Sequence, residues 1–328
     1  MKINLANIKK ARNLLNKREC VAIPTETVYG IAGNAYSDTA CKKIFRLKKR
    51  PMNNPLIIHY YDLKKLKNDC DLNTDFLKLY KRFCPGPITF ILNQKKKSKI
   101  SKVATNNKNT LAVRFPKHPV ARILLKQLKF PIAAPSANIS SRVSAVTSSD
   151  VKDDFGKKIK YILEGGRSSV GVESTIIDLR KKPKILRLGG LEVGTIQKIL
   201  KKKISINTNP SKISAPGQLR IHYSPGIPIR LNIKKTKKGE ALLLIKKNKI
   251  NKTNYYFLSK KGDLKEAAKN LYTILRKIKK DNYKSIAVDK IPNIGIGKTI
   301  NDRLISCLLY TSDAADDMQC VDLGGRRI

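Results

Sequence analysis

Two short segments hold most of the side chains that could do chemistry. PTETVYG (residues 24–30) places two threonines, a carboxylate and a phenol directly after a short apolar stretch, and KKRPMNNPLIIH (residues 48–59) runs from Lys48 and Arg50 to His59. Neighbouring cations repel each other, which costs little at a solvated surface and becomes useful opposite phosphate oxygens. Hydroxyl groups at a strand end are where α/β sheets present ligand contacts. Taken singly, the first segment also fits a plain turn and the second a solvated basic cluster.

Further polar side chains stand where other apolar runs begin or end. The segments are AVRFPKHP (112–119), APSAN (134–138), GVESTIID (171–178) and ILRLGG (185–190), and each is rich in Ser, Asn, Thr or Arg. Each segment alone is weak evidence for a site. Their order along one chain is stronger evidence than any single member.

Several common kinds of site are excluded by residue type and spacing. The three histidines lie in separate segments, the six cysteines form no CxxC pair, and no GxSxG is present, so zinc sites, disulfide frameworks and serine-hydrolase triads are not indicated. GIGKT (295–299) imitates the end of a phosphate-binding P-loop, but Pro292 stands where that motif needs glycine. We expect buried, apolar roles for the first four cysteines.

The formal net charge of +45 admits two interpretations. Clustered Lys and Arg can bind nucleic acid by releasing counterions from phosphates, which leaves a tRNA or RNA contact through a basic surface open. However, lysines are spread over the whole length and accompany many Asn and Ile residues, as a compositional bias would produce. No apolar run reaches the roughly 20 residues of a spanning helix, and the N-terminus resembles no signal peptide. We therefore expect a cytoplasmic protein with no membrane association.

Alternating apolar patterns predict an α/β fold. Helical spacing begins at Leu5, a helix is predicted from Asp38 as N-cap, and a long helix is predicted over 263–280. Strands are predicted over 20–23, 56–60, 88–92, 111–115, 132–134, 161–163, 174–179, 185–188, 241–245, 255–258 and 286–288. The helices that separate several of these strands indicate a mixed sheet.

With 328 residues, the chain is long enough for two domains. We expect a first α/β domain over 1–202, a polar and proline-rich linker over 203–238, and a small Rossmann-like α/β domain over 239–306. Residues 307–328 turn acidic and then glycine-rich, unlike the rest of the chain, and we expect this tail to be non-native.

The ordered segments resemble the catalytic domain of the YrdC-type threonylcarbamoyl-AMP synthases. CPGPITFIL (84–92) completes that resemblance, while PGQLRIHYSP (216–225) and GIGKTINDRL (295–304) resemble the linker and end of the longer, two-domain form. The resemblance implies a YrdC-like twisted mixed β-sheet flanked by helices, followed by a linker and a small Rossmann-like domain. It implies that L-threonine, bicarbonate and ATP give L-threonylcarbamoyl-AMP and pyrophosphate. This is the first step of N6-threonylcarbamoyladenosine (t6A) modification at position 37 of tRNAs reading ANN codons, and downstream tRNA threonylcarbamoyl transferase machinery would use the product.

The resemblance also implies roles for individual residues. Lys48 and Arg50 would be the catalytic cations, and Mg²⁺ would arrive with ATP instead of occupying a dedicated protein metal site. The L-threonine pocket would comprise Thr25, Tyr29, Arg50, His59 and Thr175. The ATP site would comprise Lys48, Asn54, Arg114, Ser136, Asn138, Ser174 and Arg187, closed by the linker residues Arg220, His222 and Tyr223.

Two alternatives remain open on the sequence. The first is a non-catalytic double-stranded RNA or tRNA-binding protein on the same fold, favoured by the charge. The second is carbamoyl-adenylate chemistry of the kind found in hydrogenase maturation factors that contain a similar domain. Those factors carry additional modules, including zinc-finger-like ones, for which this chain has neither the length nor the CxxC pairs.

Overall fold

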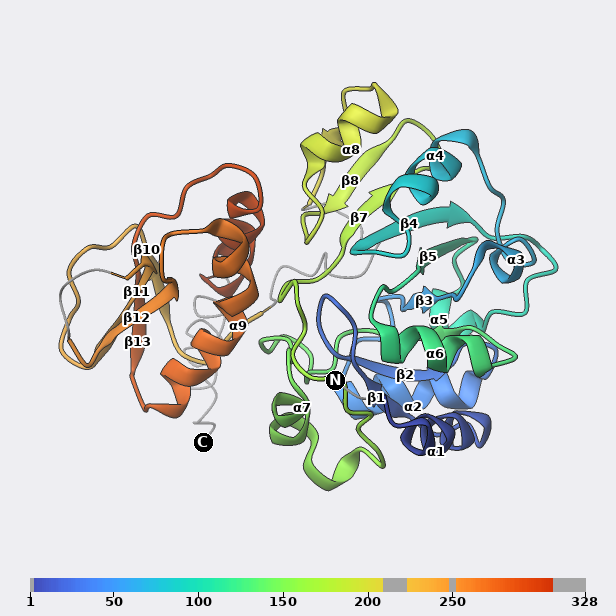
Figure 1. The fold of residues 1–328 in the computed structure, drawn as a ribbon, viewed down its shortest axis with the longest axis horizontal. Coiled ribbons are helices and arrows are strands. Elements are labelled where there is room, and N and C mark those ends of the chain that lie inside the picture. The colour runs from blue at the N-terminus through green and yellow to red at the C-terminus, as the bar shows by residue number, and fades with distance from the viewer. Residues whose placement is uncertain (1–2, 209–222, 248–251, 309–328) are drawn as a thin grey trace, which may run out of the picture. The chain divides into compact units, whose positions relative to one another are not determined.

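The computed structural model describes residues 3–208, 223–247 and 252–308, which form two compact units (Figure 1). Of the described residues, 3–140 and 144–208 belong to the first unit, and 141–143, 223–247 and 252–308 belong to the second. Among the described residues, no helix is long and apolar enough to span a membrane.

A nine-stranded mixed sheet forms the centre of the first unit, with strand order β1-β2-β6-β3-β5-β4-β7-β8-β9. The β3·β5, β4·β7 and β8·β9 pairs are parallel, and the other pairs are antiparallel. The strands are β1 (Val21–Ile23), β2 (Gly30–Asn34), β3 (Ile57–His59), β4 (Ile88–Asn93), β5 (Thr110–Arg114), β6 (Ile132–Ala133), β7 (Thr175–Asp178), β8 (Lys184–Arg187) and β9 (Ser205–Ile206).

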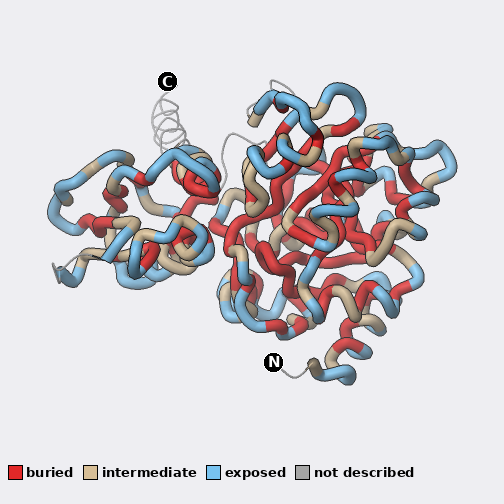
Figure 2. The backbone as a smooth tube through the Cα atoms, turned by 45° about the horizontal axis from the view of Figure 1, so that its top comes forward, coloured by how far each residue is buried: buried red, intermediate tan, exposed pale blue. Residues whose placement is uncertain are grey.

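Helices supply the apolar side chains that cover this sheet. They are α1 (Leu5–Asn16), α2 (Asp38–Lys48), α3 (Leu63–Leu66), α4 (Thr74–Phe83), α5 (Lys102–Thr105), α6 (Pro119–Gln127), α7 (Ser148–Phe155), a 3-10 turn Gly156–Lys158, and α8 (Val193–Leu200). The largest core cluster joins Ile58, Phe90 and Val113 of the sheet to Ile44 of α2 and Phe76 of α4. Figure 2 shows buried backbone running through the middle of this unit and exposed backbone along its loops.

The second unit is a four-stranded sheet with order β10-β13-β11-β12, all of whose pairs are parallel. Its elements are β10 (Ile229–Leu231), β11 (Glu240–Lys246), β12 (Tyr255–Ser259), α9 (Leu264–Lys280) and β13 (Ser285–Val288), followed by helical residues 297–308. α9 buries one stripe against the sheet and is capped by Asp263, whose side chain accepts from the Glu266 amide. The predicted α/β fold class, a mixed sheet followed by a small parallel α/β domain, is confirmed.

Three local predictions differ from the structure. The N-cap of α2 is Ser37, not Asp38, because the Ser37 hydroxyl accepts from the Ala40 amide. Residues 161–163 contribute only an isolated bridge between Ile162 and Ala22, not a strand of the sheet. β2 was not predicted, because its sequence GIAGN has two glycines and an asparagine, which are poor strand formers.

Candidate active site

The register of the central strands places several predicted site residues in one row. His59 of β3 is paired with Arg114 of β5, and Arg114 is paired with Thr89 of β4. Paired residues of neighbouring strands project from the same face of a sheet. The three side chains therefore share a face, and the next position along it holds the small apolar cluster that includes Ile57 and Ala112.

Arg114 lies at the centre of this row and is buried. Its Nη2 donates to Glu26 Oε1 at 2.7 Å and reaches Thr25 Oγ1 at 3.5 Å. Burial alone would raise the pKa of Glu26, but the Arg114 charge and the hydrogen bonds, including one from the Lys117 amide, hold it below its ordinary value. A buried, ionised Glu26 therefore fixes the Arg114 guanidinium against the PTETVYG loop.

The PTETVYG loop is held by its own hydroxyl groups and by a distant loop. Thr25 Oγ1 donates to the Val28 carbonyl at 2.6 Å and shares a hydrogen bond with Thr27 Oγ1. Ser168 Oγ donates to the Thr25 carbonyl at 3.0 Å. The Tyr29 hydroxyl donates to the Gly166 carbonyl at 2.8 Å, and burial raises the pKa of Tyr29.

Lys48, the last residue of α2, is fully buried against the APSAN loop. Its Nζ donates to the Ser136 carbonyl at 2.6 Å and also to the Asn138 carbonyl. Burial, together with the nearby Arg50 charge, lowers the pKa of Lys48 well below its ordinary value. Lys48 therefore organises the loop that carries Ser136 and Asn138, whose side chains hydrogen-bond each other at 2.6 Å.

Arg50 is buried within the turn that follows α2. Its Nε donates to the Asn54 carbonyl and its Nη2 to the Pro55 carbonyl, each at 3.0 Å. Nη2 also donates to the Asn54 side-chain oxygen. The NNP turn and the Arg50 guanidinium are thus joined by hydrogen bonds. This burial does not fit the alternative of a solvated basic cluster.

A third group forms at β7 and β8. Ser174 Oγ shares a 2.7 Å hydrogen bond with Thr89 Oγ1, and Arg187 Nη2 donates to Ser174 Oγ at 3.1 Å. Thr175 Oγ1 donates to the Leu191 carbonyl at 2.6 Å. Ser174 and Arg187, both predicted for ATP binding, are therefore in contact with each other and with the row that contains Arg114.

Three buried polar atoms of these segments have no hydrogen-bond partner among the described residues: Asn54 Nδ2, Arg114 Nε and Ser140 Oγ. Leaving a buried donor unpaired costs about 1–3 kcal/mol. Native structures accept few such groups, and each calls for an explanation. Two of the three are nitrogen donors and the third is a hydroxyl, so an oxygen-rich anionic ligand would satisfy them.

Comparisons with known proteins bear on the same segments. A family model described as "Telomere recombination" matches residues 13–189, and a model described as "Threonylcarbamoyl-AMP synthase, C-terminal domain" matches residues 191–306. Threonylcarbamoyl-AMP synthases of Pyrococcus abyssi and Bacillus subtilis are each 34% identical, over 90% and 92% of this chain and 92% and 93% of their own lengths. The crystal structure of P. abyssi Sua5 complexed with L-threonine superposes with a TM-score of 0.87 at 32% identity, covering 94% of this chain and 96% of that one.

This chain belongs to the two-domain threonylcarbamoyl-AMP synthases. The resemblance predicted from the ordered motifs is thereby confirmed, as is the activity, synthesis of threonylcarbamoyl-AMP in the t6A pathway of tRNA modification. The non-catalytic RNA-binding alternative is set aside. Enzymes of this family use ATP as substrate. The predicted boundaries at 202, 238 and 306 stay predictions.

Within the synthase, His59 lies at the end of β3 and is buried. Burial, with the Arg114 charge beside it, lowers the pKa of His59 to about 3. The imidazole is therefore neutral at physiological pH. A neutral ring can accept or donate one hydrogen bond, but it cannot supply a fixed positive charge to a ligand.

The predicted linker contacts fall on a segment that is only partly described. Arg220 and His222 lie outside the described residues. Tyr223 is buried in the second unit, where its ring stacks on Tyr272 with centroids 6.0 Å apart and lies 4.6 Å from the Arg303 guanidinium. The proposed contact of Tyr223 with ATP stays a prediction.

Sequence reasoning missed Glu26, Thr89, Ser140 and Ser168 as parts of the site. Glu26 stands inside a quoted motif, so its position was visible, but its partner Arg114 is 88 residues away. Thr89 follows the CPGP turn and was seen only as part of a strand. The missing information is the strand register, which brings Thr89 beside Arg114.

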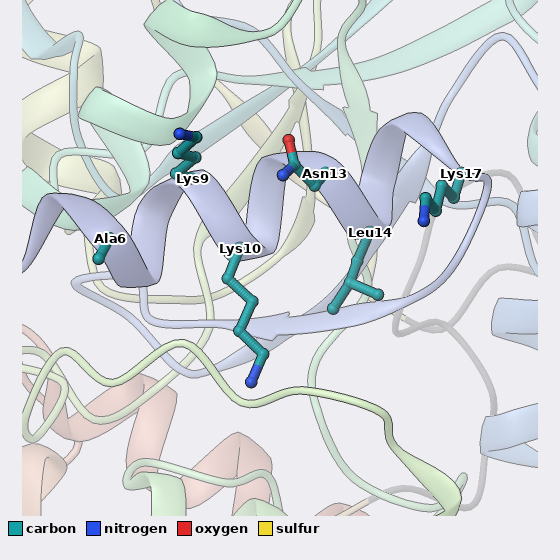
Figure 3. A pocket seen from close by; sticks show the side chains of 6 residues that line it. All are labelled: Ala6, Lys9, Lys10, Asn13, Leu14 and Lys17. Carbon is teal, nitrogen blue, oxygen red and sulfur yellow. The ribbon is translucent and has the colours of Figure 1, made fainter.

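A surface pocket of about 340 Å³ lies on α1, apart from the residues just described (Figure 3). It is lined by Ala6, Lys9, Lys10, Asn13, Leu14 and Lys17, all from that helix. Lys10 also lies 4.8 Å from the Tyr161 ring centroid. The exposed lysines that line this pocket agree with the dispersed basic surface expected from the composition.

Proposed function

We propose that the sheet face around Arg114 binds ATP and L-threonine and joins them through bicarbonate. The threonine amine and bicarbonate form a carbamate with loss of water, and a carbamate oxygen attacks the α-phosphorus of ATP. Pyrophosphate leaves, and the product is L-threonylcarbamoyl-AMP. No covalent intermediate on the enzyme is needed, so positioning and charge stabilisation carry the catalysis.

The observation that carries this proposal is the set of unpaired buried donors. Asn54 Nδ2 and Arg114 Nε belong to two of the family motifs, Ser140 Oγ lies two residues after a third, and all three atoms lack partners among the described residues. A triphosphate offers them oxygen acceptors in a buried setting, where charge-assisted hydrogen bonds are strongest. Asn54, Arg114, Ser136, Asn138, Ser174 and Arg187 are the proposed ATP contacts.

Lys48 and Arg50 are the proposed catalytic cations. Lys48 is held 2.6 Å from the Ser136 carbonyl, and a phosphate oxygen arriving beside it would favour its protonated form. Its charge would then oppose the charge that develops at the α-phosphate. Without the ligand, burial lowers the pKa of Lys48, and the phosphate charge would act in the opposite direction.

The proposed threonine pocket comprises Thr25, Tyr29, Arg50, His59 and Thr175. The P. abyssi Sua5 crystal contains L-threonine, and we transfer that ligand to this chain. A guanidinium matches a carboxylate in a bidentate geometry, so Arg50 is assigned to the threonine carboxylate. Neutral His59 would fit the uncharged hydroxyl of threonine better than its carboxylate.

Mg²⁺ is proposed to arrive with the triphosphate. Among the described residues, no three His, Cys, Asp or Glu side chains gather into a metal site. The three carboxylates within the motifs of the first unit are engaged, Glu26 by Arg114, Glu173 by the Ser144 hydroxyl at 2.6 Å and Asp178 by Arg180 at 2.6 Å. Mg²⁺ commonly binds through substrate phosphates with few protein ligands.

The product is proposed to pass to a separate tRNA threonylcarbamoyl transferase machinery. A direct contact with tRNA through the basic surface, for which the α1 lysines are candidates, stays a prediction. A strong dependence of any such binding on salt would be its signature.

Threonine-dependent release of pyrophosphate from ATP tests the proposed function. Lys48→Ala and Arg50→Ala should each lower release by about 100-fold or more while the protein stays folded, because Lys48 would stabilise charge on the reacting phosphates and Arg50 would hold the threonine carboxylate. Lys9→Ala on the exposed face of α1 is the matched control and should behave as wild type. Wild-type turnover in either site variant would contradict the assignment.

A further inference from the structure

The chain crosses between the two units directly after the proposed ATP-binding loop. Residues up to Ser140 belong to the first unit, Ser141–Val143 belong to the second, and the first unit resumes at Ser144. Ser136 and Asn138 are thus only a few residues from a segment that the second unit holds. No sequence motif marks this crossing.

Backbone hydrogen bonds hold the three-residue segment within the second unit. The Ser224 amide donates to the Ser141 carbonyl at 2.8 Å, and the Val143 amide donates to the Ser224 carbonyl at 3.2 Å. Arg142 and Ser224 form a parallel bridge. Arg276 of α9 completes the arrangement by donating from Nη2 to the Val143 carbonyl at 2.6 Å.

Strained backbone marks both sides of this junction. Ser141 has φ of 69° and Tyr223 has φ of 64°, a left-handed conformation that non-glycine residues adopt only when their surroundings over-determine it. Tyr223 is fixed by ring contacts with Tyr272 and with the Arg303 guanidinium. The segment is therefore clamped to a rigid part of the second unit.

On the N-terminal side of Ser141–Val143, the chain is hydrogen-bonded to Lys48. The Ser140 amide donates to the Lys48 carbonyl at 2.8 Å, and Lys48 Nζ in turn donates to the Ser136 carbonyl. The loop between Ser136 and Ser140 is thus fixed at one end by Lys48 and continues at the other into the clamped segment. Displacing Val143 would strain this loop through the chain itself.

We propose that Arg276 is a positioning residue for ATP binding: by holding the Val143 carbonyl, it fixes the segment that continues the Ser136–Ser140 loop. This role rests on the proposed function, because it requires that loop to contact ATP. Arg276 is not among the proposed substrate contacts.

Hydrogen exchange tests the physical link without reference to activity. In Arg276→Ala, peptides covering 136–143 should exchange faster than in wild type, while peptides from β11 should not change. Lys265→Ala, an exposed lysine of the same helix, is the matched control and should leave both unchanged. Arg276→Lys retains a donor and should restore part of the protection. Unchanged exchange of 136–143 in Arg276→Ala would overturn the proposal.

Steady-state kinetics test the consequence. Arg276→Ala should raise KM for ATP about tenfold, the effect expected for one lost hydrogen bond, with KM for threonine and kcat within about twofold of wild type. A general loss of folded protein would instead lower kcat alone, which would overturn the positioning role.

Protection of 136–143 by ATP in the wild-type enzyme tests the proposed function separately. If ATP gives no protection there but Arg276→Ala still speeds exchange, the assignment of the loop to ATP fails while the physical link stands. In that case Arg276 stabilises the loop, but the loop does not bind ATP, and the proposal that Arg276 positions a nucleotide is overturned.

Discussion

Arg114 is the residue on which the geometry of the site converges. It is paired with His59 and Thr89 across the sheet, and its guanidinium is fixed by Glu26, while Nε has no hydrogen-bond partner in the part of the chain that the structure describes. A lysine could keep the ion pair with Glu26, but it has one nitrogen where arginine has three. The shape of the guanidinium, and not only its charge, is what the site uses.

Arg114→Lys should therefore separate charge from shape. We expect turnover to fall by about 100-fold, because the donors aimed at the ligand are lost while the buried carboxylate keeps a cation. Threonine-dependent pyrophosphate release measures the loss, and the melting temperature should change little. Arg114→Ala would leave Glu26 buried and unpaired and should be strongly destabilised. Wild-type turnover in Arg114→Lys would show that a positive charge at this position is enough for catalysis, and it would contradict a role for the guanidinium shape.

His59 gives the first unit a defined acid sensitivity. Its pKa is about 3 in the folded protein because it is buried beside Arg114, and about 6.5 when unfolded. Between these values the unfolded chain binds more protons, so His59 contributes stability that is complete above pH 6.5 and is lost as pH falls toward 3. The expected slope is about 1.4 kcal/mol per pH unit.

His59→Gln should reduce the pH dependence of the unfolding free energy of the first unit by that slope between pH 6 and 4. Urea denaturation at several pH values measures it, and NMR of the imidazole should show no titration between pH 5 and 8. Equal slopes for the two proteins would mean that His59 titrates normally.

Much of the candidate site could be predicted at the residue level, because its members occur in ordered motifs at strand ends. The contacts between them could not. Lys48 donates to the Ser136 carbonyl across 88 residues of sequence, and its burial counts against the alternative of a solvated cation. Pairings of that kind depend on the register of strands far apart in the chain, which local residue patterns do not encode.

At the scale of elements, the site depends on a loop that passes very close to β7. A Cβ atom on Gly189 would lie 2.3 Å from the Thr175 amide nitrogen and 2.5 Å from the Glu173 carbonyl oxygen. Both are backbone atoms, so they cannot move aside without shifting Ser174 as well. Gly194 in α8 has nothing within 4 Å of the same position.

Gly189→Ala and Gly194→Ala form a matched pair. Gly189→Ala should destabilise the first unit by at least about 2 kcal/mol and lower turnover, because β7 and its Ser174 must shift. Gly194→Ala should stabilise the helix by about 0.5–1 kcal/mol, since alanine is the better helix former, with activity unchanged. Denaturant melts and pyrophosphate release measure both. A harmless Gly189→Ala would show that the ILRLGG loop can relax away from β7.

Elements with strong apolar runs could be predicted, and elements stabilised by their neighbours could not. β4 and β5 are continuous runs buried at nearly every position, and α9 combines length with a clear helical periodicity. By contrast, β2 has weak strand propensity and forms because β1 and β6 pair with it on either side. β10 lies within the predicted linker and is a strand because β13 pairs with it. In both cases tertiary pairing overrides local preference.

At the scale of the whole molecule, two units with separate sheets should respond separately to a local lesion. Glu240 of β11 is buried at the end of the second sheet and accepts from Arg230 at 2.6 Å, the Lys237 amide at 2.9 Å and the Ser285 hydroxyl at 3.1 Å. These hydrogen bonds, the one from Arg230 first, lower the pKa of Glu240 to about 2.

Glu240→Gln should therefore destabilise the second unit and leave the first intact. Hydrogen exchange at pH 7 should quicken in β10, β11 and β13 and stay unchanged in β3 and β5. The stability that Glu240 provides is present above its unfolded pKa of about 4.5 and is lost as pH falls toward 2. The difference in the free energy of unfolding of the second unit between Glu240→Gln and wild type should therefore narrow as pH falls over that range. A difference in unfolding free energy that is independent of pH, or faster exchange in β3 and β5, would contradict a local, charge-dependent role for Glu240.

The kinetics of Glu240→Gln also test the role of α9, because Arg276 lies on that helix. KM for ATP should rise only if hydrogen exchange in α9 also becomes faster in this variant.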